Sequence, residues 1–149
     1  MGYTHYWRLK AATLSTEALV IIGELLGRAY HRGIIQREFD DPRPPFVSDT
    51  KIRFNGVGES GHETFYFTST PDTGQSNTGW TFHFCKTARK PYDRVVMQVL
   101  IVLKYYLGKA ITVSSDGDFT VEWAAARREL EHRYGIRTVS GQQLERVAA

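Results

Sequence analysis

Residues 91–107 form the segment that most limits the folds open to this chain. The run Val95–Leu107 is apolar almost throughout, and it is interrupted by Gln98 and Lys104. A helix that is apolar on nearly every side has to be buried by the rest of the protein. Proline is favoured at the first helical position, so Pro91 predicts where this helix begins. We therefore expect a central helix over residues 91–107, which is too short to span a bilayer.

The remaining segments predict mostly strands. Aromatic, β-branched or alternating patterns typical of strands occur at residues 3–8, 51–55, 62–67, 80–85 and 110–114. Two further helices have capping signals: Ser15 or Thr13 precedes residues 16–32, which Gly33 ends, and Asp118 precedes a helix to Tyr134, which Gly135 ends. Loops are expected at residues 40–50, where prolines cluster, and over Thr68–Gly79.

This order of elements predicts an α+β fold. About three helices should pack on one face of a mainly antiparallel four- to five-stranded sheet. With 149 residues the chain is long enough for one globular domain over residues 1–149. A polar C-terminal tail, partly disordered, is expected from about residue 138.

The strand at residues 80–85 alternates most regularly. Trp80, Phe82 and Phe84 share one face, whereas Thr81, His83 and Cys85 share the other. Because the first set is large and aromatic, we expect it to pack against the helix over residues 91–107.

A basic loop separates this strand from that helix. Lys86, Arg89 and Lys90 lie close to the free amides expected near Pro91 and Tyr92, with Thr87 among them. Cations and a helix N-terminus together favour anions, most often phosphate. The alternative, in which these cations are merely solvated ends of a strand and a helix, stays open.

The composition suits a ligand that carries both phosphate and a ring. The net charge is +3 and aromatic residues make up 13% of the chain. Aromatic faces beside basic groups are a common way to hold nucleotides. Tyr6, Tyr66 or His83 are the candidates to flank a base, and His62 is a further candidate for ligand binding. The first hypothesis is therefore non-enzymatic binding of an anionic, nucleotide-like small molecule, in a pocket that a homo-oligomer would deepen.

Two other classes of function remain possible. One is a metal-independent phosphoesterase or nucleotide-modifying enzyme, with His62 or His83 as acid or base and Lys86 and Arg89 stabilising phosphoryl charge. The other is a module that binds a host protein or single-stranded nucleic acid. The five histidines and one cysteine show no metal-ligand spacing, so neither a metal nor a cofactor is expected.

Four motifs resemble those of one protein family. They are Gly2–Trp7, Phe54–Gly58 together with Gly61–Phe65, Phe84–Asp93, and Ser115–Asp118. The family consists of small uncharacterised proteins of bacteriophages and of bacterial genomes that carry phage genes, and the resemblance covers most of residues 2–123. Phage proteins of this size include sponges that sequester nucleotide signals of bacterial immunity, cyclic nucleotides among them. The resemblance thus implies this role by analogy, in the cytoplasm of the host; the start of the chain also lacks an apolar signal region.

Overall fold

The expected α+β fold is confirmed in the computed structural model, which describes residues 2–69, 79–140 and 143–146. The predicted loop over Thr68–Gly79 lies mostly outside these described residues. The helices and strands run in the following order along the chain: β1 Thr4–Lys10, α1 Thr16–His31, β2 Ile35–Gln36, β3 Phe46–Val47, β4 Lys51–Gly56, β5 Phe65–Thr68, β6 Trp80–Lys86, α2 Asp93–Leu107, β7 Ile111–Ser115, α3 Ala124–Tyr134, β8 Thr138–Ser140 and β9 Leu144–Arg146.

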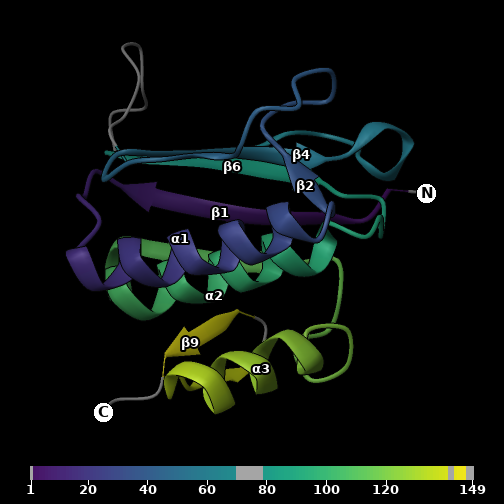
Figure 1. Cartoon of the computed structure of the whole chain (residues 1–149). Coiled ribbons are helices and arrows are strands. Elements are labelled where there is room, and N and C mark those ends of the chain that lie inside the picture. Colours follow the sequence, from purple (N-terminus) through teal and green to yellow (C-terminus); the bar gives the residue numbers. More distant parts are fainter. Residues whose placement is uncertain (1, 70–78, 141–142, 147–149) are drawn as a thin grey trace.

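The strands form two antiparallel sheets. The larger sheet has five strands in the order β6-β1-β7-β9-β8, so the first strand of the chain lies between two strands that follow it by many residues. In the smaller sheet β4 is central and pairs antiparallel with β2, β3 and β5. In Figure 1 the labelled strands β1, β4 and β6 lie above α1 and α2, and α3 lies below α2.

Helix α2 is the centre of the hydrophobic core, as its composition predicted. Every residue from Val95 to Lys104 is buried. The helix packs against α1, α3, β7 and β9. It begins at Asp93, so Pro91 lies two residues ahead of the helix, in a turn.

The other helix signals have mixed outcomes. Ser15 caps α1 by accepting a hydrogen bond from the amide of Ala18 at 3.2 Å, as expected. Asp118 instead organises a turn, accepting from the Thr120 amide at 2.7 Å, and α3 begins only at Ala124. Gly135 ends α3 in the left-handed region, with φ 69°.

The C-terminal segment differs from the expected tail. Residues 138–140 and 144–146 form β8 and β9, and β9 pairs with β7 through Val113 and Leu144. The physical reason is Leu144, which is fully buried and fills the core beside α2. In the described parts of this segment, burial of Leu144 and strand pairing thus hold residues whose composition is largely polar.

Candidate functional site

The aromatic side chains of β6 lie on the surface, and the expectation that they pack against α2 is wrong. Phe82 is 60% exposed and Phe84 is 49% exposed, whereas Thr81 and Cys85 on the other face are buried. The physical reason lies in β1, whose Trp7 and Leu9 already fill the inner face of the sheet. Small side chains of β6 fit beside these large ones, so the Phe side chains point outwards.

The register of the sheet gathers these side chains with residues of β1. Tyr6 is opposite Phe84, Arg8 is opposite Phe82 and Lys10 is opposite Trp80. Successive side chains of a strand alternate between faces, so these residues and Lys86 share one face of the sheet. We call this set, Tyr6, Arg8, Lys10, Trp80, Phe82, Phe84 and Lys86, the outer face.

The rings of the outer face form a row. Tyr6 and Phe82 are stacked, with centroids 6.1 Å apart and an interplanar angle of 26°, and Phe82 and Phe84 follow at 6.2 Å. The hydroxyl of Tyr6 donates to Asp116 Oδ1 at 3.0 Å, which fixes the orientation of its ring. The same hydrogen bond raises the pKa of Tyr6.

Cations border this row of rings. Arg8 and Lys10 lie 5.6 and 5.1 Å from the ring centroid of Trp80. Such cation–π contacts hold the long side chains over aromatic surface without neutralising their charge. The outer face therefore offers flat apolar rings and positive charge together.

The basic loop, residues Lys86–Lys90, continues from the end of this row. Lys86 and Arg89 are exposed and Lys90 is partly exposed. No carboxylate of the described residues lies within ion-pair distance of Lys86, Arg89 or Lys90. Their positive charge is consequently available to an anion from solution.

The backbone of the basic loop is held in an unusual conformation. Ala88 and Arg89 have φ of 51° and 57°, and no other non-glycine residue of the described segments is left-handed. The amides of Thr87 and Ala88 both donate to the carbonyl of Tyr3, at 3.0 and 3.3 Å. Left-handed backbone costs a residue with a side chain about 1–2 kcal/mol. The rest of the fold thus imposes this shape on the loop.

A buried hydrogen-bond chain centred on His5 supports the loop from below. The His5 ring is completely buried, with Nδ1 2.7 Å from Ser115 Oγ and Nε2 2.6 Å from Asp93 Oδ1. The hydroxyl of Thr87 donates to the same Asp93 oxygen at 2.5 Å. One imidazole therefore joins β1, β7, the basic loop and the start of α2.

The proton positions in this chain follow from its donors. Trp123 Nε1 and the amide of Gly117 can only donate, and both bond to Ser115 Oγ, at 3.1 and 2.9 Å. Ser115 must then donate to His5 Nδ1, which assigns the ring hydrogen to Nε2, facing Asp93. Ser, His and Asp in a row also form nucleophilic triads. Here the serine oxygen is already fully hydrogen-bonded and His5 is buried, so the chain positions backbone rather than presenting a nucleophile.

Glu63 joins the connection between β4 and β5 to the same region. Its amide donates to the carbonyl of Lys86 at 3.2 Å, and its carboxylate accepts from the Lys86 amide at 2.8 Å. The hydroxyl of Tyr92 donates to the Glu63 carbonyl at 2.5 Å. Segments from all four of the motifs described in the sequence, Gly2–Trp7, Phe54–Phe65, Phe84–Asp93 and Ser115–Asp118, therefore meet around the basic loop.

The structure separates the predicted site residues into groups. Lys86, Arg89, Lys90 and Tyr6 lie around the basic loop and the adjoining outer face. Thr87 and Tyr92 are buried and bonded to protein atoms, so they support the loop instead of facing a ligand.

The other predicted residues lie elsewhere. His83 is on the inner side of β6, stacked on Trp7 at 5.7 Å, with Nε2 3.0 Å from the Thr81 hydroxyl. His62 is exposed in the β4–β5 connection. Tyr66 lies under Arg53, 4.7 Å from its guanidinium, and lines a separate cavity of about 250 Å³.

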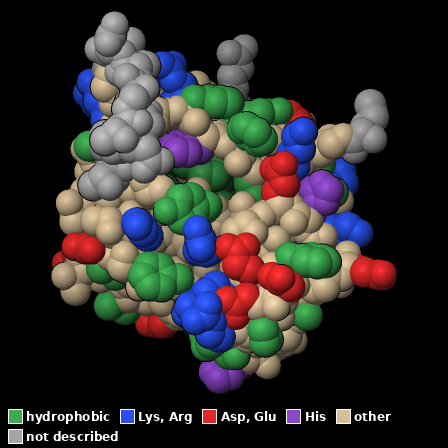
Figure 2. All heavy atoms as spheres, turned by 90° about the horizontal axis from the view of Figure 1, so that it is seen from above, with side chains coloured by type: hydrophobic (Ala, Val, Ile, Leu, Met, Phe, Trp, Pro, Cys, Tyr) green, Lys and Arg blue, Asp and Glu red, His purple; other side chains and the backbone are tan. Residues whose placement is uncertain are grey.

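That separate cavity carries charges of both signs. It is lined by Arg37, Glu38, Asp41, Arg43, Phe46, Lys51, Arg53 and Tyr66. Arg43 pairs with Asp41 at 2.7 Å and Arg53 with Glu38 at 3.2 Å. Figure 2 shows basic and acidic side chains side by side in the view from above. Much of the positive charge around Tyr66 is thus paired within the protein.

The sequence interpretation missed Phe82, Phe84, Arg8 and Lys10 as surface residues of the site. A signal was present in β1, where Tyr6, Arg8 and Lys10 alternate with Trp7 and Leu9. A strand whose one face is partly cationic exposes that face, and its neighbour β6 has to follow the same orientation.

Comparison of the chain with protein-family models, with curated proteins and with solved structures finds no match. Within residues 2–69, 79–140 and 143–146, no group of three or more His, Cys, Asp or Glu side chains is arranged to hold a metal ion. In the same residues, no helix is long and apolar enough to cross a membrane.

Proposed function

We propose that the basic loop and the adjoining end of the outer face bind a nucleotide-type ligand. The observation that carries this proposal is the direct continuation of an exposed aromatic row, Phe82–Phe84, into a loop whose three cations have no carboxylate of the described residues within ion-pair distance. Any base can stack on an exposed aromatic ring, and phosphate oxygens form charge-assisted hydrogen bonds with Lys and Arg. Lys86 belongs to both parts, so one ligand can contact both.

The residues have distinct roles in this proposal. Phe84 and Tyr6, which face each other across β6 and β1, provide the surface for the base. Lys86, Arg89 and Lys90 provide charge for the phosphate. The His5 chain holds the loop in place before the ligand arrives, which lowers the ordering cost of binding.

Sequestration of a nucleotide signal, such as a cyclic nucleotide of bacterial immunity, is part of the same proposal. A sponge needs to hold its ligand unchanged. The buried His5 and the fully bonded Ser115 hydroxyl support holding over conversion, because neither is presented to a ligand. A homo-oligomer in which two outer faces enclose the ligand would strengthen such a site.

Calorimetric titration with a panel of linear and cyclic mono- and dinucleotides tests the proposal. The double variant Lys86→Glu/Arg89→Glu should lose at least about tenfold in affinity for the nucleotide that binds best. Lys109→Glu/Arg133→Glu makes the same charge change at exposed positions outside the site and serves as the matched control. Equal affinity of the two double variants, or absence of binding across the panel, would remove the proposal.

Chromatography of each nucleotide after incubation with the protein distinguishes holding from conversion. We expect every nucleotide to be recovered intact. A new product that forms at catalytic protein concentrations would instead favour the phosphoesterase or nucleotide-modifying alternative.

A further inference from the structure

We infer that the whole outer face binds single-stranded nucleic acid, which extends the proposed nucleotide site along the sheet and rests on that proposal. The basic loop and Phe84 occupy one end of this face. The face continues to the other end of β6 through Phe82, Arg8, Trp80 and Lys10. Together with the basic loop, these side chains form a surface larger than a single nucleotide would cover. Strand β6 has seven residues, which corresponds to roughly 20 Å along the sheet.

The spacing of the rings favours an extended single strand. The centroids of Tyr6, Phe82 and Phe84 follow one another at 6.1 and 6.2 Å. Bases in a duplex strand rise by only about 3.4 Å per nucleotide. Bases seated on successive rings must therefore be unstacked from each other, as bases are when single strands bind to aromatic side chains of a sheet. Comparable sheets stack about two or three bases.

The charge of the outer face matches a nucleic-acid backbone. Arg8, Lys10 and Lys86 are exposed, and β1 and β6 contain no acidic residue at all. Among the described residues, two acids are hydrogen-bonded at the Lys86 end of this face: Asp116, held by the Tyr6 hydroxyl and the Thr4 amide, and Glu63, whose carboxylate accepts from the Lys86 amide. An apolar surface on a protein partner would leave the three cations between the rings without partners. The phosphates of a nucleic acid would pair with them.

Fluorescence anisotropy with labelled oligodeoxynucleotides of increasing length tests this inference. We expect the affinity to rise from a mononucleotide to a short oligonucleotide and then to level off, and duplex of the same sequence to bind more weakly. Phe82→Ala should weaken oligonucleotide binding by about 5- to 150-fold, the usual effect of one stacking ring. The logarithm of affinity should fall with the logarithm of salt concentration with a slope of about −3.5, since Arg8, Lys10 and the three cations of the basic loop neutralise about five phosphates.

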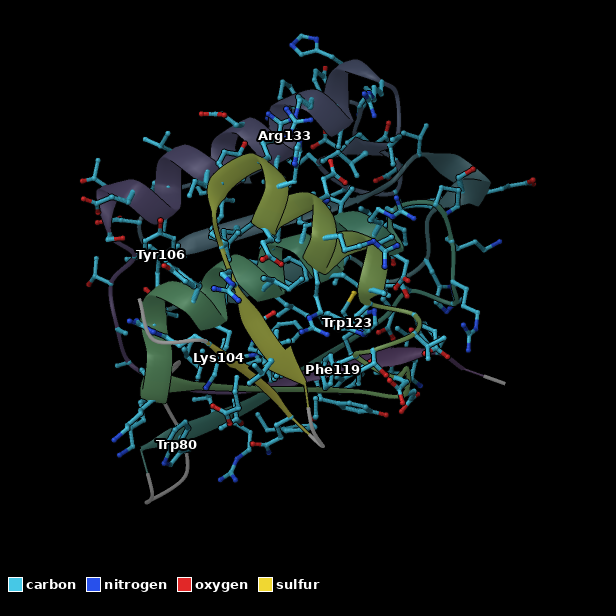
Figure 3. The ribbon with its side chains drawn as sticks, turned by 90° about the horizontal axis from the view of Figure 1, so that it is seen from below. Trp80, Lys104, Tyr106, Phe119, Trp123 and Arg133 are labelled. Atoms are coloured by element: carbon cyan, nitrogen blue, oxygen red, sulfur yellow. The ribbon has the colours of Figure 1, made fainter. Side chains whose placement is uncertain are left out.

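The chain offers matched controls for these variants. Phe39 is 60% exposed, like Phe82, and lies in the connection between β2 and β3, so Phe39→Ala should leave the affinity unchanged. Lys10→Glu should weaken oligonucleotide binding, whereas Arg133→Glu should not. Figure 3 shows Arg133 and Trp80 on opposite sides of the molecule, which places the control far from the Trp80 end of the face.

The outcomes separate this inference from the proposed function. If oligonucleotides bind no more tightly than mononucleotides, and Lys10→Glu has no effect, the inference fails while the nucleotide site remains. If neither class binds, both fail. A dimer in light scattering that Phe82→Ala dissociates would show that the outer face is occupied by a second copy and would overturn the inference. Duplex binding as strong as single-strand binding would overturn it too.

Discussion

The guanidinium of Arg89 lies over the ring of Tyr3, 4.0 Å from its centroid. This contact connects the basic loop to the first strand. A cation–π contact at an exposed site is worth about 0.5–1 kcal/mol and leaves the charge of the arginine intact. A carboxylate in place of the ring would have neutralised that charge, so the fold positions Arg89 without consuming its capacity to bind an anion.

His5→Ala should destabilise the protein by about 2–4 kcal/mol, because it leaves Ser115 and Asp93 without their shared partner in the interior. Urea denaturation followed by circular dichroism measures the change. His132 is exposed on α3, and His132→Ala should alter stability by no more than about 0.5 kcal/mol. Similar losses of unfolding free energy in the two variants would show that the buried hydrogen-bond chain does not stabilise the protein more than an exposed histidine does.

Glycine at position 88 should be neutral or stabilising, by up to about 1 kcal/mol. Ala88 has φ 51°, a region that glycine adopts without the steric cost of a side chain. Ala125→Gly, in the first turn of α3, is the matched substitution at a right-handed position, and it should be destabilising, by up to about 1 kcal/mol. Thermal melts of both variants check the opposite signs. A clear loss of stability in Ala88→Gly would mean that the loop is not left-handed in solution.

Gly117→Ala should destabilise the fold through Tyr3. A Cβ at position 117 would lie 2.0 Å from the Tyr3 hydroxyl oxygen, so the ring would have to move, at a cost of about 1–3 kcal/mol.

Tyr3→Phe supplies the test of this cause. It removes a hydroxyl that is buried without a hydrogen-bond partner among the described residues, so alone it should be nearly neutral. Combined with Gly117→Ala it should recover part of the loss, and a double-mutant cycle of unfolding free energies measures this coupling. Additive effects would contradict the contact.

The free energy of unfolding should decline in alkaline solution. Burial raises the pKa of the Cys85 thiol from 9.0 to about 12, and burial, followed by the nearby Asp93 carboxylate, raises the pKa of Tyr3 from 10.0 to about 12. Between about pH 9 and pH 12 the unfolded chain loses these protons while the folded protein keeps them. Stability that is complete below about pH 9 is therefore lost as the pH rises.

Denaturation midpoints measured from neutral pH to about pH 11 check this decline. The Cys85→Ala/Tyr3→Phe variant should show a shallower decline than the unmodified protein. The Cys85 thiol should also react slowly with a disulfide reagent in the folded state and rapidly in urea. Parallel pH profiles for the two proteins would refute the assignment.

The sequence predicted those parts of the fold that local signals determine. The apolar run of α2, the Ser15 cap and the alternation in β4 and β6 each reside in a few neighbouring residues. Alternation divides β6 into two faces, however, and does not say which face is buried. That choice depends on Trp7 and Leu9, which reach β6 only through the pairing of β1.

The candidate site was predicted in part for the same reason. Lys86, Arg89 and Lys90 are close in sequence, so their convergence was visible in the chain. The support beneath them was not, since His5 meets Asp93 and Ser115 from far away in sequence. The short strands β8 and β9 have no local signal of their own and depend on the core that receives Leu144.

The central place of β1 has a consequence for synthesis of the protein on the ribosome. Trp7 pairs with His83 on one side and with Val113 on the other, so the first strand emerges long before either neighbour has been translated. Contacts this distant in sequence slow folding. We expect α1 and the β4–β5 hairpin to form first, with the larger sheet closing only after β6 and β7 have been released. Until then the apolar side of the nascent first strand is uncovered, which makes this interval the one in which the protein depends most on chaperones.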